Sequence, residues 1–161
     1  MNPYFQASQS SDSAPPLEVE IVSDAEGDEF WSFVGSKQNQ RWTWYVIERN
    51  EGIILAYHHG RRTDESCKQL FEKLAPFSLG TIYTDNWQSY QKYIPADRHV
   101  IGKKDTWRIE RKNLNFRTHL KRLSRKTICF SKNETIHDNV IGLYINQFYY
   151  QYGCYSKSIA T

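Results

Sequence analysis

Hydrophobic and aromatic residues in the first third of the chain follow the pattern of β-strands. Three runs rich in aromatic and β-branched residues, at 30–34, 41–47 and 53–58, alternate with polar positions or consist largely of strand-forming residues. The polar segments 36–40 and 49–52 lie between these runs and predict turns. Three strands joined by such short connections form an antiparallel meander, which is what this part of the sequence predicts.

The hydrophobic spacing becomes helical after the third strand. Thr63 is a residue type that caps helices, and Cys67, Leu70 and Leu74 then recur on one face. Pro76 cannot continue the helix, so it marks the end of this element. The sequence therefore predicts a helix that packs on the meander through these apolar residues.

Strands and helices alternate in the second half of the chain. The pattern predicts a strand at 81–84, a short helix at 86–93, a strand at 98–101 and a long helix at 105–126. A last helix is expected to begin at the capping box formed by Ser131 and Glu134 and to pack through these residues: Ile136, Val140, Leu143 and Tyr144. The order β-β-β-α-β-α-β-α-α predicts a mixed α/β sheet flanked by helices, the order of a ribonuclease-H-like domain.

Length and composition favour one globular domain. A chain of 161 residues with 39% hydrophobic and 15% aromatic residues can bury a substantial core. Residues 1–17 are rich in Ser, Gln and Pro and are expected to be a flexible leader. The folded domain is then expected at 18–152, with a tail at 153–161.

Cysteine usage and hydropathy exclude several classes of protein. The three cysteines form no CxxC pair, which argues against a zinc ribbon or a disulfide framework. No apolar run approaches the length of a membrane span. These features predict a cytoplasmic protein without a membrane partner, and the charge described next favours association with the nucleoid.

Charge is distributed unevenly along the chain. The formal net charge is only +3, yet residues 18–29 carry six acids and no base. Residues 105–126 carry eight Lys or Arg and a single acid in their interior, Glu110. Such a basic segment favours a polyanionic partner, and we interpret it as a nucleic-acid contact with Glu110 in a separate role.

Three acids fall where a metal site could be assembled. Asp28 lies at the head of the predicted first strand, on the same alternating face as Phe30. Asp85 ends the strand 81–84, at the carboxyl end where sites in α/β folds gather. Glu110 lies on the flank of the predicted basic helix, between its apolar and basic faces.

Each of these acids also has a simpler interpretation. Asp28 could be one solvated acid of the segment 18–29, with Asp24 or Glu26 as the functional residue instead. Asp85 could cap the helix that follows it. Glu110 could support surface bases at i±4, although Thr106 and Leu114 occupy those positions.

Closely spaced carboxylates suit divalent cations that take hard oxygen ligands. Phosphoryl transfer commonly uses two such ions, which stabilise the attacking and the leaving oxygen. Mg²⁺ keeps several water ligands, so a few carboxylates suffice to bind it. The three acids therefore predict a site for two Mg²⁺ ions, for which Mn²⁺ could substitute.

Several motifs carry a resemblance to a known family. Residues 26–37, EGDEFWSFVGSK, resemble the opening motif of the InsB-type transposases of the insertion-sequence-one family. Residues 84–87, TDNW, are similar to the second motif of that family. Residues 108–117, RIERKNLNFR, and 120–126, LKRLSRK, resemble the third. The similarity runs from about 26 to 152.

The resemblance implies a DDE transposase on a ribonuclease-H-like fold. It assigns Asp28, Asp85 and Glu110 as the catalytic and metal-binding triad of an enzyme that cuts DNA at element ends and joins it to target DNA. It also implies a homo-oligomer on DNA, and an upstream zinc-finger and helix-turn-helix segment supplied by fusion. The expected DNA contacts are the bases of the third motif and one amide: Arg108, Arg111, Lys112, Asn113, Arg117, Lys121, Arg122, Arg125 and Lys126.

Two alternative functions fit the same pattern. The same fold could act as a ribonuclease-H-like nuclease that hydrolyses nucleic acid without strand transfer. The chain could also be a non-enzymatic DNA-binding remnant that inhibits transposition. Joined donor and target products would distinguish the first alternative, and Mn²⁺ binding would distinguish the second.

Overall fold

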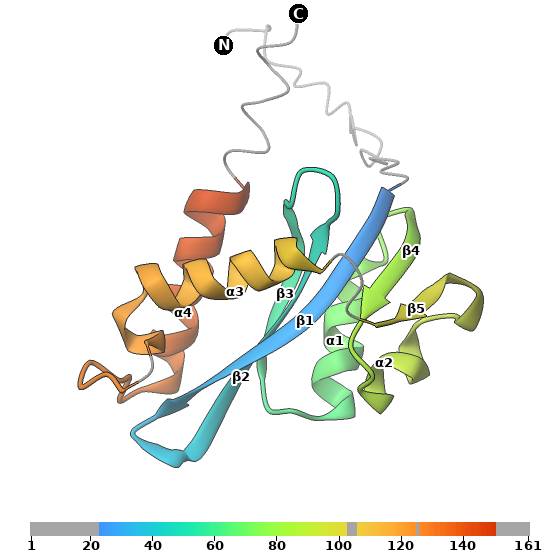
Figure 1. Ribbon diagram of the computed structural model, residues 1–161. Coiled ribbons are helices and arrows are strands. Elements are labelled where there is room, and N and C mark those ends of the chain that lie inside the picture. Colours follow the sequence, from blue (N-terminus) through green and yellow to red (C-terminus); the bar gives the residue numbers. More distant parts are fainter. Residues whose placement is uncertain (1–22, 103–105, 125, 151–161) are drawn as a thin grey trace, which may run out of the picture.

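The computed structural model describes residues 23–102, 106–124 and 126–150 (Figure 1). The predicted leader 1–17 and tail 153–161 lie outside the described residues. The strands are β1 (Ser23–Val34), β2 (Ser36–Glu48), β3 (Ile54–Gly60), β4 (Leu79–Thr84) and β5 (His99–Ile101). The helices are α1 (Asp64–Leu74), α2 (Gln88–Tyr93), α3 (Trp107–His119) and α4 (Glu134–Ile145), with 3-10 turns at Ala96–Arg98 and Lys121–Leu123 and a π-helical end at Asn146–Tyr150.

The five strands form one mixed sheet in the order β3-β2-β1-β4-β5. Strands β1, β2 and β3 are antiparallel neighbours, whereas β4 pairs parallel to β1 and β5 pairs parallel to β4. Helix α1 makes the crossover from β3 at one edge to β4 on the far side of β1. This is the ribonuclease-H-like arrangement, so the fold predicted from the order of elements is confirmed.

Helices cover both faces of the sheet, and each face has its own hydrophobic core (Figure 1). Trp44 and Tyr45 of β2 are both 0% exposed, and as neighbours in a strand they point to opposite faces. Trp44 belongs to the core under α1 and α2, which also contains Leu70. Tyr45 belongs to the core under α3 and α4, which also contains Phe116.

The first two strands are longer than the pattern predicts. Residues 36–40 are the start of β2 and not a turn, because Gly35 alone makes the reversal with a φ of 75°. Strand β1 begins at Ser23, so Asp28 lies in its middle and not at its head. The strand was predicted to start too late because its first residues include several acids, which are uncommon in buried strands. Ala25, between two of these acids, is nevertheless 0% exposed.

The basic segment is not one helix. Helix α3 ends at His119, and Leu120 takes an extended conformation with φ −105° and ψ 100°. A 3-10 turn follows, which returns Leu123 to the same core as Phe116. The prediction of a continuous helix over 105–126 is therefore wrong, because burial of Leu123 requires the chain to turn after α3.

Helix α4 buries only Tyr144 of the four residues through which it was predicted to pack. Its N-cap is Asn133, whose Oδ1 accepts a hydrogen bond from the Ile136 N–H at 3.0 Å, so the capping box at Ser131 is wrong. Ile136 and Leu143 are 56% and 67% exposed. The buried residues of the helix are His137, Ile141, Gly142, Tyr144 and Ile145.

A buried histidine fixes the orientation of α4. His137 is 0% exposed, with Nε2 2.7 Å from Ser32 Oγ of β1 and Nδ1 2.7 Å from Ser131 Oγ. Burial lowers the pKa of this imidazole, which favours its neutral form. The buried face of α4 was predicted wrongly because apolar periodicity does not identify a polar residue such as His137 at the centre of that face.

Candidate active site

The three predicted acids line one cavity of about 170 Å³, between the middle of β1, the end of β4 and the start of α3. Its lining consists of Glu26, Gly27, Asp28, Tyr83, Thr84, Asp85, Gly102, Thr106, Ile109 and Glu110. Asp28, Asp85 and Glu110 are 57 and 25 residues apart in the sequence. The fold therefore brings together the acids of all three motifs.

Strand pairing places the two aspartates beside each other. Strands β1 and β4 run parallel with Glu26 opposite Tyr83, and β4 ends at Thr84. Asp85 therefore leaves the sheet next to the part of β1 that carries Asp28. Gly27 of β1 lies beside the end of β4, where an added Cβ atom would meet Thr84 Cγ2 at 3.4 Å, an ordinary contact distance.

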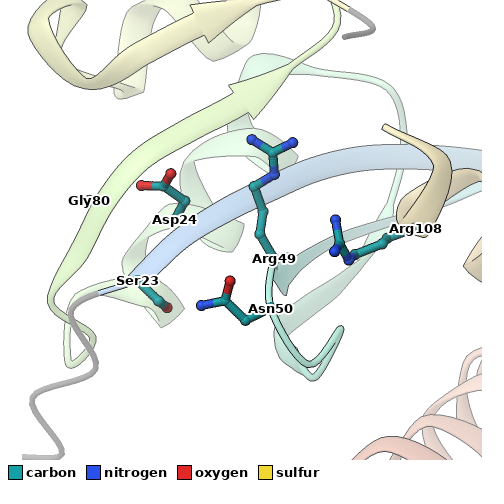
Figure 2. Close-up of a pocket in the computed structure, with 6 residues that line it drawn as sticks. All are labelled: Ser23, Asp24, Arg49, Asn50, Gly80 and Arg108. Atoms are coloured by element: carbon teal, nitrogen blue, oxygen red, sulfur yellow. The ribbon is translucent and has the colours of Figure 1, made fainter. Parts of the chain in front are cut away.

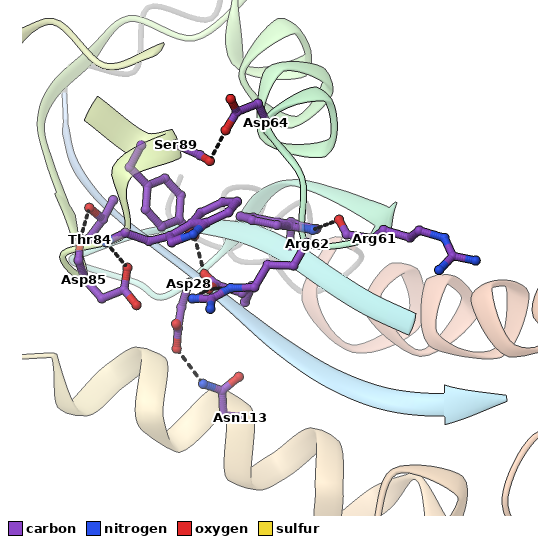
Figure 3. A network of polar contacts seen from close by, with 12 residues as sticks. Asp28, Arg61, Arg62, Asp64, Thr84, Asp85, Ser89 and Asn113 are labelled. Atoms are coloured by element: carbon purple, nitrogen blue, oxygen red, sulfur yellow. Dashed lines mark hydrogen bonds and ion pairs between the residues drawn. The ribbon is translucent and has the colours of Figure 1, made fainter. Parts of the chain in front are cut away.

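Asp28 has a strongly perturbed carboxyl group. Burial, with smaller contributions from the charges of Glu29 and Asp85, raises its pKa to about 6 in spite of the hydrogen bonds that it accepts. One of those bonds comes from Asn113 of α3, whose Nδ2 donates to Asp28 Oδ2 at 2.7 Å (Figure 3). A buried anion beside a second carboxylate is an environment that favours a cation.

Asp85 makes a local turn but does not cap α2. Its Oδ1 accepts a hydrogen bond from the Trp87 N–H at 3.0 Å, and its backbone carbonyl accepts one from Thr84 Oγ1 at 2.9 Å. Trp87 is the N-cap residue of α2 and makes no side-chain cap. Asp85 is therefore not the helix cap of the simpler interpretation. Its side chain accepts one hydrogen bond in the turn before α2.

Glu110 lies at the mouth of the cavity. Its neighbour Ile109 is buried against the sheet, and Glu110 itself is exposed. Within the part of the chain that the structure describes, its carboxylate has no hydrogen bond or ion pair. The alternative interpretation, in which Glu110 pairs with basic residues on the surface of the helix, therefore has no support among the described contacts.

The three acids do not form a preassembled cluster. Among residues 23–102, 106–124 and 126–150, no three His, Cys, Asp or Glu side chains are grouped closely enough to hold one metal ion. The structure therefore places the three acids around one cavity without gathering them as ligands of a single ion. Mutual repulsion between carboxylates opposes closer approach unless a cation offsets it.

The acids and oxygens of the cavity nevertheless fit a hard divalent cation. The titratable side chains in its lining are carboxylates and one phenol, with no His or Cys among them. Mg²⁺ prefers such oxygen ligands, and the raised pKa of Asp28 shows that its carboxylate lacks full compensation. Asp28, Asp85 and Glu110 are the side chains that could hold it.

A chain of hydrogen bonds links Tyr45, the cross-strand neighbour of Asp28 on β2, to Asp28 through Asn113 of α3. Tyr45 Oη donates a hydrogen bond to Asn113 Oδ1 at 2.8 Å, and Asn113 in turn donates to Asp28. Both ends of the Asn113 amide are thus engaged inside the protein, although the sequence suggested a DNA contact for it. Only the spacing of three residues from Glu110 hinted at a place near the site.

Two further acids of β1 lie near the predicted ones: Glu26, which the sequence offered only as an alternative to Asp28, and Glu29, which it assigned no role. Glu26 is 1% exposed and pairs with Arg49, whose Nε lies 2.8 Å from Glu26 Oε1. Glu29 points to the other face, where Arg62 donates to its Oε1 and Tyr90 Oη donates to its Oε2 at 2.7 Å. Burial raises the pKa of both acids, and the arginines oppose that change.

The basic residues of the third motif have different surroundings. Arg108 stacks on the Trp107 ring at 4.6 Å, and Arg122 donates to Ser131 Oγ at 3.2 Å. Burial lowers the pKa of Lys112 to about 8. Arg117 is half-buried, whereas Arg111, Lys121 and Lys126 are exposed, and Arg125 lies outside the described residues. The bases therefore do not form the single helical face that the sequence predicted.

Comparison with solved structures finds distant likenesses. The catalytic core domain of HTLV-2 integrase, solved in complex with magnesium in a trimeric form, has a TM-score of 0.46 at 15% identity, over 63% of this chain and 71% of that one. The simian T-cell lymphotropic virus intasome in complex with PP2A regulatory subunit B56 gamma has a TM-score of 0.49 at 18% identity. That match covers 61% of this chain and 39% of the chain in the intasome.

Comparison of sequences is more specific. The InsB protein of insertion element iso-IS1n from Shigella dysenteriae is 52% identical over 120 residues, which is 74% of this chain and 92% of the relative. The InsB protein of insertion element IS1 from Shigella flexneri is 43% identical over 131 residues, 81% of this chain and all of the relative. The family model described as IS1 transposase matches residues 21–151. With the topology of the sheet and the acids of the cavity, these matches show that the chain belongs to the IS1 transposase family.

Proposed function

We propose that this chain is the catalytic domain of a DNA transposase that cuts phosphodiester bonds at element ends and joins the freed 3′-hydroxyl groups to target DNA. The observation that carries this proposal is the shared cavity of Asp28, Asp85 and Glu110. Each acid comes from a different motif and a different element of the fold. Membership of a transposase family supports DNA as the substrate.

The proposed cofactor is a pair of Mg²⁺ ions, for which Mn²⁺ could substitute. Asp28, Asp85 and Glu110 would hold them, because these acids supply the hard oxygen ligands of the cavity. When bound, two such ions stabilise the attacking and the leaving oxygen of a phosphodiester. Binding would also offset the burial of the Asp28 carboxylate, which is the main cause of its raised pKa, and the smaller repulsion from Glu29 and Asp85.

The surrounding residues would position the acids and the DNA. Asn113, held by Tyr45, would fix the rotamer of Asp28. Arg111, Lys121 and Lys126 are exposed and would contact the phosphate backbone without reading sequence. A homo-oligomer on DNA and a fused upstream segment that recognises the element ends complete the proposal.

A strand-transfer assay tests this function. The chain is incubated with a labelled DNA fragment that carries the end of its element, with a target plasmid and with Mg²⁺ or Mn²⁺. We expect joined donor and target products that disappear when EDTA removes the metal. Cleavage without joined products would favour the nuclease alternative. DNA binding without Mn²⁺ binding or cleavage would favour the non-enzymatic alternative.

Replacing Asn113 by Ala is expected to weaken both Mn²⁺ binding and cleavage by roughly 10- to 100-fold, the usual effect of losing a residue that orients a metal ligand. The physical reason is that Asp28 loses the donor at 2.7 Å that fixes its carboxylate. Titration with Mn²⁺, followed by electron paramagnetic resonance, measures the first effect, and a single-turnover cleavage assay measures the second.

Thr118→Ala is the matched control for this variant. Thr118 is on the exposed face of the same helix and bonds only to the carbonyl of Leu114 among the described contacts. The control should keep wild-type Mn²⁺ affinity. An Asn113→Ala protein with unchanged Mn²⁺ affinity and normal melting temperature would contradict the positioning role.

A further inference from the structure

A second and larger cavity adjoins the first. It has a volume of about 400 Å³ and lies where β1 and β4 begin, under the first turn of α3 (Figure 2). Its lining consists of Ser23, Asp24, Arg49, Asn50, Gly80 and Arg108. No acid of the proposed triad contributes to it, so its chemistry differs from that of the first cavity.

The two cavities share a wall formed by the Arg49 side chain and its partners. Arg49 lies 2.8 Å from Glu26 Oε1, and its guanidinium stacks 3.9 Å from the centre of the Tyr83 ring. Glu26 and Tyr83 both line the first cavity. Arg108, across the second cavity, precedes the Glu110 of the first by two residues. A ligand in the second cavity would therefore be next to the proposed catalytic acids.

Two guanidinium groups reach this cavity from distant parts of the chain. Arg49 comes from the turn after β2, and Arg108 comes from the first turn of α3 (Figure 2). The planar fork of arginine matches the oxygens of a phosphate, and Asn50 adds an amide that can donate. The ion pair and the aromatic ring already hold Arg49, so little side-chain freedom remains to be lost on binding.

The acids near the cavity are engaged elsewhere. Asp24 Oδ1 accepts a hydrogen bond from the Thr81 N–H at 2.9 Å, which joins β1 to the start of β4. Glu26 lies behind Arg49, and burial raises its pKa while the charges of Arg49 and Arg108 oppose that rise. Asp24 is therefore the one carboxylate in the lining of the second cavity, and a hydrogen bond from the Thr81 N–H already engages it. The other polar side chains of the lining include the donors Arg49, Asn50 and Arg108.

We propose that this second cavity binds a backbone phosphate of the same DNA strand that is cut in the first cavity, with Arg49 and Arg108 as the binding groups. The inference rests on the proposed function, because the ligand is a phosphodiester of the transposase substrate. It goes beyond the basic segment, since Arg49 lies almost 60 residues before Arg108 and outside any basic run. The strand would then pass from the second cavity over Glu26 and Tyr83 to the triad.

The test measures DNA binding of the full chain in EDTA, where no cleavage occurs, by fluorescence anisotropy over a series of salt concentrations. Arg108→Gln should lower the affinity and reduce the slope of log K against log salt by about 0.9, the value expected for one lost phosphate contact. Lys68→Gln is the control, because it removes one exposed positive charge from α1 on the other face of the sheet.

Arg49 is replaced more conservatively, because its guanidinium forms an ion pair with the buried carboxylate of Glu26. Arg49→Lys keeps the positive charge beside the buried carboxylate and removes the fork. This variant should lower DNA affinity while the melting temperature stays within a few degrees of wild type. A second protein, Arg49→Gln with Glu26→Gln, avoids an unpaired buried acid and should lose the phosphate contact completely.

Three outcomes decide between the interpretations. Wild-type affinity and slope in Arg108→Gln and in the Arg49–Glu26 double variant would overturn the inference. Competition by about 10 mM inorganic phosphate without any change in DNA slope would overturn it as well, because the site would then bind free anions only. Failure of the triad would leave these binding measurements unchanged and abolish only the expected joined products.

Discussion

Glu110→Gln is expected to reduce DNA cleavage and joining by about 10³-fold or more, because a lost metal ligand removes several kcal/mol of transition-state stabilisation. Glutamine keeps the size of the side chain and removes its negative charge. Glu110 is exposed and has no partner among the described residues, so the change should leave the fold unaltered. The decisive measurements are single-turnover cleavage, Mn²⁺ affinity and melting temperature on the same protein.

DNA binding without metal should stay the same in this variant or become tighter, because one negative charge near the phosphate backbone is removed. Glu65→Gln is the matched control, since Glu65 is an exposed glutamate in the first turn of α1 and bonds only to Gln69 among the described contacts. Metal-dependent cleavage at the wild-type rate in Glu110→Gln would show that the third ligand has been misassigned. Glu26, the other glutamate of the cavity, would then be the next residue to change.

Phe116→Ala is expected to lower the free energy of unfolding by about 3–5 kcal/mol, the range for removal of a buried aromatic side chain. The ring is 0% exposed and packs against Phe30, Tyr45 and Tyr144, with ring centres 4.9, 5.6 and 5.4 Å away. Because this ring joins α3 to the sheet and to α4, the loss should also displace the helix that carries Glu110. Urea denaturation measures the stability, and Mn²⁺ affinity reports the site.

Leu114→Ala on the same helix is the control for Phe116→Ala. It also truncates an apolar side chain of α3 to Ala, but at an exposed position where no core packing is lost. Leu114 is 58% exposed, so its truncation should change the stability by no more than about 0.5 kcal/mol. A loss below about 1 kcal/mol in Phe116→Ala would contradict the assignment of this ring to the core. Normal stability together with lost activity would point to a catalytic role for the ring instead.

Much of the fold could be predicted because it depends on neighbours in the chain. Thr63 caps α1 as expected, with its side chain accepting from the Ser66 N–H, and Leu70 and Leu74 are buried on its inner face. The order of the elements then restricts the sheet to few topologies. The predictions failed where a buried residue was polar, as at His137, or where acids interrupted a strand, as at Glu26.

The candidate site was predictable in part for a similar reason. The resemblance of short motifs identified Asp28, Asp85 and Glu110, and the cavity that they line agrees with that choice. Their distances from one another were not predictable, and the three do not form a metal-sized cluster here. The roles proposed for Asn113 and Arg49 depend on contacts with residues far away in the sequence.

No helix among the described residues is long and apolar enough to cross a membrane.

The break of α3 at Leu120 could not be predicted, because the local pattern of bases and apolar residues is compatible with a longer helix. The need to bury Leu123 against a distant core decides it.

The sequence by itself determined the order of the elements and the uneven charge, and it was sufficient to propose the three acids that line the first cavity. These follow from local spacing, because the periods of helices and strands and the residue types of motifs are set by neighbours in the chain. Only the tertiary structure decided which face of α4 is buried, that hydrogen bonds link Tyr45 through Asn113 to Asp28, and that Arg49 and Arg108 line the same second cavity. The physical reason is that these contacts arise from strand register and from packing between residues far apart in the chain, which no local pattern records.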